Sequence, residues 1–88
     1  MSKFAMGKIL MTQGAQGQFK PDFLQECLSR HSKGDWGDLG DDDKKANDLA
    51  LKEGGRLLSS YKDAGGNELW VITEADYSTT TCLLSDEY

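Results

Sequence analysis

The sequence has few of the residues from which small catalytic or metal sites are built. It contains one histidine and two cysteines, and it has no apolar run near the roughly 18 residues that a membrane-spanning helix needs. Cys27 and Cys82 each lack a second cysteine nearby, so the spacing excludes a zinc knuckle and a redox pair. With His31 alone and no Gly-x-Ser-x-Gly turn, nothing indicates a nucleophilic triad. We expect both cysteines to be free thiols that pack as small apolar residues.

Positive charge is also scarce. The chain has 10 basic and 15 acidic residues, a formal charge of −5 and an isoelectric point near 4.6. Nucleic-acid binding depends on Lys and Arg side chains that neutralise phosphates, so this balance argues against a direct nucleic-acid partner. The first residues lack the apolar core of a signal peptide. We therefore expect a cytoplasmic protein that binds no membrane.

The length of 88 residues suits a single domain, which we assign to residues 1–88. A hydrophobic content of 38% with 28% charged residues is typical of a folded globular domain rather than a disordered tail. Because a chain this short buries a small core, an internal cavity for a cofactor is not expected. We predict no cofactor.

The first half of the chain predicts a strand followed by two helices. Residues 4–12 mix β-branched and long apolar side chains over the length of a strand, and the glycines and glutamines that follow indicate a polar loop. Pro21 suits the first turn of a helix and Gly34 its end. A second helix is expected to begin at residues 41–43, with one of these aspartates as its cap, and to end at residues 54–55.

From residue 56 the apolar residues recur with the period of a strand. Residues 56–62 and 68–74 predict a hairpin whose glycines make the turn, and residues 79–84 suit one further strand. The expected fold is therefore α+β, in the order β-α-α-β-β-β: a three- or four-stranded antiparallel sheet with the first strand at an edge and two helices on one face. The predicted core residues are Ile9, Met11, Phe23, Leu24, Leu28, Leu49, Leu57 or Leu58, Val71 and Leu83, and a register slip of one residue would exchange the two sheet faces.

The acidic stretch at residues 32–55 is the candidate functional segment. Its carboxylates invite a calcium interpretation, but their spacing does not match an EF-hand loop, and we predict no metal site. Trp36 has two interpretations: an exposed anchor for a protein partner, or a side chain that fills the gap between two helices. The candidate binding residues are Asp35, Trp36, Asp38, Asp41, Asp42 and Asp43.

Four segments carry a resemblance to a known group of proteins. They are G-K-I-L-M-T-Q-G-A at residues 7–15, S-R-H-S-K-G-D-W-G-D-L at 29–39, A-L-K-E-G-G-R-L-L-S-S-Y at 50–61 and L-W-V-I-T-E-A-D-Y-S-T-T-T-C-L-L at 69–84. Together they resemble a family of short bacterial proteins described as plasmid-related, and sometimes as subunit M of type I restriction systems. The resemblance covers nearly the whole chain. It implies carriage on plasmids and integrated elements, and it implies no particular biochemical activity.

Because no catalytic constellation is visible, we predict a non-enzymatic acidic interaction protein. One alternative is a DNA mimic, whose carboxylates imitate phosphates and occupy the basic groove of a host restriction or other DNA-handling enzyme. A second alternative is a small metal-dependent hydrolase or nuclease that uses the carboxylates between Asp35 and Asp43. A homodimer closed through a sheet edge or an uncovered sheet face is a third possibility.

Overall fold

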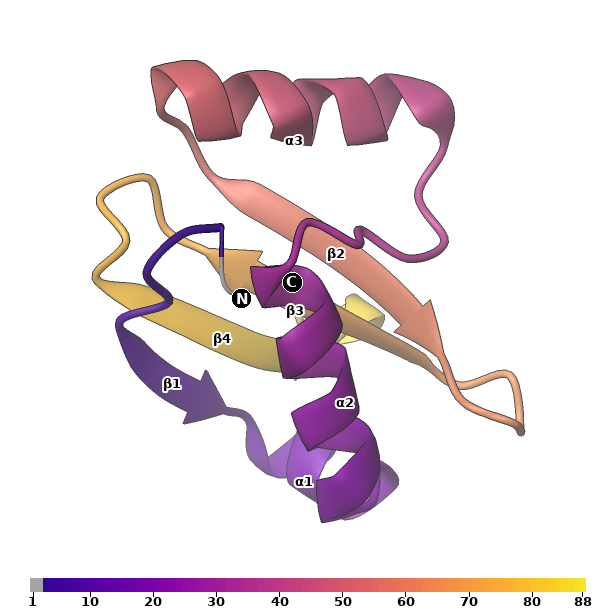
Figure 1. Ribbon diagram of the computed structural model, residues 1–88. Coiled ribbons are helices and arrows are strands. Elements are labelled where there is room, and N and C mark those ends of the chain that lie inside the picture. The colour runs from indigo at the N-terminus through magenta and orange to yellow at the C-terminus, as the bar shows by residue number, and fades with distance from the viewer. Residues whose placement is uncertain (1–2) are drawn as a thin grey trace.

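A four-stranded sheet organises residues 3–88, the part of the chain that the computed structural model describes (Figure 1). The strands are β1 Lys8–Met11, β2 Leu57–Lys62, β3 Glu68–Thr73 and β4 Thr79–Leu84, in the spatial order β1-β4-β3-β2. The helices are α1 Gln13–Gln18, α2 Pro21–Ser32 and α3 Asp41–Glu53, and a short 3₁₀ turn, η1 Ser85–Glu87, follows β4. The predicted α+β class is confirmed, and so is the antiparallel β2-β3-β4 meander.

The sheet is mixed rather than wholly antiparallel, because β1 pairs with β4 in parallel. β1 does lie at an edge, as predicted. The chain leaves β1, passes through three helices and enters the sheet again at β2 on the opposite edge. A crossover of this length allows β2 to run parallel to β1. Because β3 is antiparallel to β2 and β4 is antiparallel to β3, β4 also runs parallel to β1.

Residues 13–18 form α1, where the sequence predicts a polar loop. The Thr12 hydroxyl caps the helix by accepting a hydrogen bond from the Ala15 amide at 3.0 Å. Ala15 is fully buried and Phe19, just after the helix, is nearly so; both belong to the main core. This packing and the cap outweigh the low helix propensity of the two glycines in the segment.

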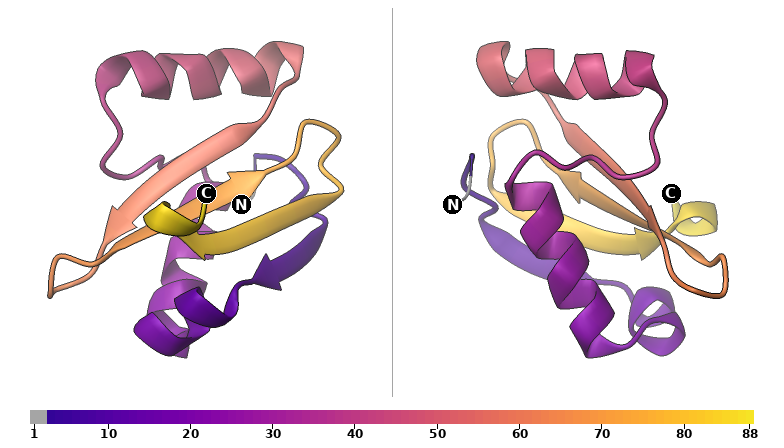
Figure 2. Two further views of the ribbon diagram at one scale, coloured as in Figure 1. Left: turned by 180° about the vertical axis from the view of Figure 1, so that it is seen from behind. Right: turned by 45° about the vertical axis from the view of Figure 1, so that its right-hand side comes forward.

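The main core lies between α2 and one face of the sheet, while η1 lies on the other face (Figure 2). The members of the main core are Ala15, Phe19, Leu24, Cys27, Leu28, Tyr61, Leu69, Val71 and Cys82. Met11 and Phe23 are half-buried and pack against this core. Both cysteines are free and buried. Of the helices in residues 3–88, none has the length and apolar character to cross a membrane.

Most of the predicted core is confirmed, and two of its members are wrong. Leu57 is the buried residue of the pair 57–58, and Leu83 is buried outside the main cluster. Ile9 is 39% exposed and Leu49 is 55% exposed. Ile9 belongs to an edge strand with a neighbour on one side only, and Leu49 lies on the outer surface of α3.

The second predicted helix, α3, is confirmed, but it lies along the edge strand β2 instead of covering the sheet face beside α2 (Figure 1). Asn47 is its buried residue. The Asn47 amide donates to the Leu58 carbonyl at 2.6 Å, and its Oδ1 accepts from the Leu58 amide at 3.1 Å. Asn47 therefore takes the place of a further strand at this position of β2.

Substituting Asn47 with alanine should lower the free energy of unfolding by about 2 kcal/mol, because the outward amide and carbonyl of Leu58 lose their partners in a partly buried site. Urea unfolding followed by circular dichroism measures this change. Leu49→Ala on the same helix is the control: since Leu49 is exposed, its truncation should change stability by no more than about 0.5 kcal/mol. Equal effects of the two substitutions would show that Asn47 does not hold the edge.

Candidate functional site

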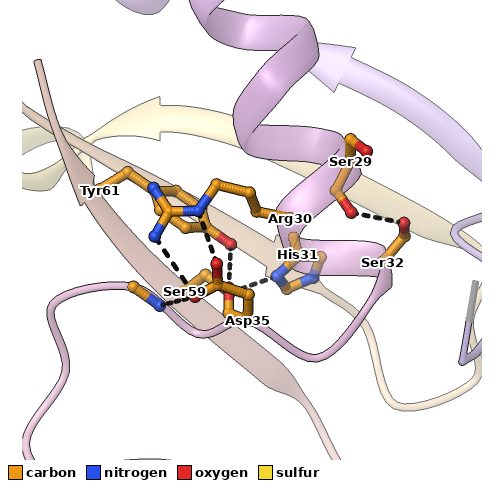
Figure 3. Close-up of polar contacts among 8 residues, drawn as sticks. Ser29, Arg30, His31, Ser32, Asp35, Ser59 and Tyr61 are labelled. Carbon is orange, nitrogen blue, oxygen red and sulfur yellow. Dashed lines mark hydrogen bonds and ion pairs between the residues drawn. The ribbon is translucent and has the colours of Figure 1, made fainter.

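The start of the acidic segment is held by an ion pair between Arg30 of α2 and Asp35 (Figure 3). Arg30 Nε lies 2.7 Å from Asp35 Oδ2, and Arg30 Nη2 lies 3.3 Å from Asp35 Oδ1. The hydrogen bond from Arg30 lowers the pKa of the Asp35 carboxyl. Both side chains are about half exposed, so the pair stabilises the fold by at most about 1 kcal/mol. Its main effect is to fix the direction in which the chain leaves α2.

The segment then pairs with β2 as a short parallel bridge. Ser60 donates its amide to the Trp36 carbonyl at 3.2 Å and accepts from the Asp38 amide at 2.7 Å. A glycine is needed between them: Gly37 has a φ of +77°, and a Cβ atom there would overlap the Ser60 carbonyl oxygen. Tyr61 of β2 also bonds this segment, because its hydroxyl donates a hydrogen bond to the Asp35 carbonyl.

Trp36 is a structural residue rather than an exposed anchor. Its side chain is only 3% exposed, and its Nε1 donates to Asp48 Oδ1 of α3 at 3.0 Å. The indole packs against Phe4 and His31, with ring centroids 6.4 and 5.6 Å away. The interpretation in which Trp36 fills the space between elements therefore matches the geometry, and its ring has no free face for a partner.

The remaining candidate residues lie together at the start of α3 and are exposed. They are Asp38, Asp41, Asp42 and Asp43. The expectation that an aspartate caps α3 is wrong, because Gly40 is the N-cap residue and no side chain bonds the first turn. The three aspartates instead occupy the first turn, where the helix dipole favours negative charge.

Most of the net charge of the protein lies in this region. Residues 35–53 hold seven acidic residues and three lysines, a net charge of −4, against −5 for the whole chain. The lysines include Lys44 and Lys45, which directly follow the three aspartates and offset part of their charge.

The carboxylates do not converge on a common point. Within residues 3–88 no three His, Cys, Asp or Glu side chains are placed to hold one metal ion. Two surface hollows of about 310 Å³ each border Phe19, and neither is lined by a candidate aspartate. The arrangement therefore offers a charged surface and not a cleft with acids inside it.

A buried series of hydrogen bonds around His31 is a feature that the sequence does not predict. Thr80 donates its hydroxyl hydrogen to the Met6 carbonyl at 2.7 Å. It must then accept from Thr73, at 2.7 Å, and Thr73 in turn accepts from His31 Nε2 at 2.9 Å. His31 Nδ1 is left as an acceptor, and the Ser59 hydroxyl donates to it. The chain of bonds thus assigns His31 as the neutral tautomer with its proton on Nε2.

Burial agrees with this assignment, because it lowers the pKa of His31 from 6.5 to about 4. His31 is fully buried and makes edge contacts with the rings of Phe4 and Trp36. The hydroxyls that it contacts come from β2 and β3, and their alignment depends on the strand register, which the sequence alone does not fix.

Comparison of the chain with family models, with curated proteins and with solved structures finds no match. The case for a function therefore rests on the residues of this chain.

The stability of the protein should fall as the pH is lowered from 6.5 to about 4. Over this window unfolded His31 binds a proton that the folded state excludes, because its folded pKa is about 4. The difference between the unfolded and the folded pKa corresponds to a loss of about 3 kcal/mol in the free energy of unfolding once the pH has fallen below both values. Chemical unfolding at a series of pH values measures the slope.

His31→Asn is the matched variant, since it removes the titrating group. It should be less stable at every pH but should lose the slope between pH 6.5 and 4. Asp35, whose pKa lies below its usual value of 3.8, stabilises the folded state above that value and contributes to the pH dependence only in more acidic solution. An unchanged slope in the variant would assign the effect to other groups.

Proposed function

We propose that this protein is a non-enzymatic binding protein that presents the exposed acids at the start of α3 to a basic surface of a protein partner. The observation that supports this most directly is how little of α3 the fold uses. Of its 13 residues, Asn47 is the buried one, and the helix packs mainly on β2. A domain this small usually needs each helix for its core, so a helix with so much free surface is suited to recognition.

The chemistry of the surface indicates the class of partner. Asp38, Asp41, Asp42 and Asp43 are exposed, and attraction between such carboxylates and Lys or Arg residues is long-ranged and screened by salt. Leu49 adds an exposed apolar group further along the same helix. The resemblance to plasmid-related proteins favours a basic DNA-handling enzyme of the host as the partner, with the carboxylates in the place of phosphates. Two buried free thiols favour a reducing compartment such as the cytoplasm.

The proposal is tested by two variants that change the charge equally. Asp38→Asn, Asp41→Asn, Asp42→Asn neutralises the surface, and Asp22→Asn, Glu26→Gln, Asp86→Asn neutralises three exposed acids elsewhere. Each triple change takes the formal charge from −5 to −2. Asp35 is kept in both variants because it bonds Arg30 and Gly37.

Partners are captured from a bacterial lysate on the immobilised wild type and on each variant, at rising salt concentration, and are identified by mass spectrometry. The α3 variant should lose about tenfold in affinity, at about 0.5 kcal/mol for each exposed charge, while the control retains its partners. Elution of a partner by added duplex DNA would support the DNA-mimic form of the proposal. Recovery of the same partners by all three proteins, with no dependence on salt, would rule out the acidic surface as the binding site.

A further inference from the structure

The two edge strands of the sheet differ in how many of their outward backbone groups have hydrogen-bond partners. On β2, the outward backbone groups of Leu58 and Ser60 are paired with Asn47 and with the bridge at residues 36–38. On β1 the outer edge is nearly open: in Figure 1, α1 follows the end of this strand, and one hydrogen bond from α1 reaches the edge. Natural proteins protect a strand edge by short length, charged side chains, a bulge, a cover or a partner, because unpaired amides and carbonyls can pair with another strand.

The backbone of β1 shows which groups face outward. The Lys8 amide donates to the Ser78 carbonyl and the Thr12 amide donates to the Cys82 carbonyl, so residues 8, 10 and 12 face β4. Because backbone groups alternate in direction along a strand, the amides and carbonyls of Ile9 and Met11 point away from β4. Within residues 3–88, the bond from Gln16 Nε2 to the Met11 carbonyl at 3.1 Å is the one contact on this side, and the amide and carbonyl of Ile9 have no partner there.

The side chains at this edge are apolar and exposed on both faces of the sheet. Ile9 is 39% exposed and lies level with Thr80 on the face that α2 covers. Leu10 is 40% exposed and lies on the opposite face. Next to Ile9, on the α2 side, Met11 borders a hollow of about 310 Å³. The other residues that line it are Gln16, Phe19, Pro21, Leu24 and Gln25.

We propose that two copies of this chain associate by antiparallel pairing of their β1 strands about a twofold axis at Leu10. In this register Ile9 of each copy lies opposite Met11 of the other, and the outward amides and carbonyls form hydrogen-bonded pairs. The Gln16 side chain gives up its bond to the Met11 carbonyl. Other symmetric registers are poorer, because they place Gly7, with a φ of +63°, or the start of α1 opposite the strand.

Side chains and charges are complementary in this arrangement. The two Leu10 side chains meet at the axis, and each Ile9 lies beside Met11 of the other copy at the mouth of the hollow. Lys8 of one copy lies opposite Thr12 of the other, and the Thr12 hydroxyl donates to Glu87 Oε1 at 2.7 Å. Lys8 of each copy therefore lies near the Glu87 carboxylate of the other copy. The twofold symmetry repeats this ion pair on the two sides of the axis.

The oligomeric state provides the first test. Light scattering and sedimentation over a range of concentrations should give a mass that rises from 9.7 kDa towards twice that value. Leu10→Lys puts two like charges at the axis and should raise the dissociation constant roughly tenfold or more. Leu49→Lys, at an exposed leucine on α3, is the matched control and should associate like the wild type.

A disulfide provides the second test and reports the register. Facing residues at a non-hydrogen-bonded antiparallel position have Cα atoms about 4.5 Å apart, within the range of a disulfide. Leu10→Cys should therefore cross-link two chains under mild oxidation, while Ile9→Cys and Leu49→Cys should not. The native Cys27 and Cys82 are buried, and burial raises the pKa of each to about 12, so they provide an inert background.

Three results would overturn the proposal. The first is a wild-type protein that stays at 9.7 kDa up to about 1 mM, an affinity of only about 4 kcal/mol; in that case the edge is either unused or occupied by a strand from another protein. The second is a dimer that Leu10→Lys leaves intact. The third is cross-linking of Leu49→Cys or Ile9→Cys as fast as Leu10→Cys.

Discussion

The outward backbone groups of β2 must find hydrogen-bond partners, and the way they do so determines where most of the remaining structure lies. Leu58 is paired by the side chain of Asn47, and Ser60 is paired by the backbone on either side of Gly37. An unpaired amide or carbonyl in such a position costs about 1–3 kcal/mol. Once both positions are satisfied, α3 is fixed along the edge and the acidic residues at its start can point only to solvent.

The same constraint explains why Trp36 and His31 are buried. The bridge at Gly37 brings residue 36 against the sheet, where its indole covers the imidazole of His31. The imidazole is then sealed from water with hydroxyl groups on both of its nitrogens. A polar network of this kind stabilises the fold only when every member has a partner, and the chain of bonds from Ser59 to Met6 meets that condition.

The parts of the fold that were predictable are those set by local chemistry. Pro21 and Gly34 bracket α2, the glycines after Glu53 follow α3, and the alternation of apolar residues indicates the three strands of the meander. The direction of β1, the formation of α1 and the position of α3 depend on contacts between residues far apart in the sequence. Thr12 and Ala15 illustrate this, since a polar, glycine-rich segment becomes helical when it is capped and packed on the core.

The candidate site was predictable to a similar extent. Charge predicted correctly that Asp38 and residues 41–43 are exposed, because an ionised carboxylate is costly to bury. Trp36 was ambiguous, since its burial depends on a gap that exists only once α2, α3 and β2 are assembled. The hydroxyl groups around His31 could not be predicted from the sequence, because Thr and Ser are common in strands and only the strand register brings these residues together.

The parallel pairing of β1 with β4 also sets an order of events during synthesis. β1 leaves the ribosome before its partner strand, residues 79–84, and residues 12–78 separate the two. Until then its apolar residues have no neighbour in the sheet, whereas β2, β3 and β4 are local in sequence and can pair as soon as they appear. The meander is therefore the part of the nascent chain expected to fold first, and β1 is the strand most exposed to chaperones and to wrong pairing while translation continues.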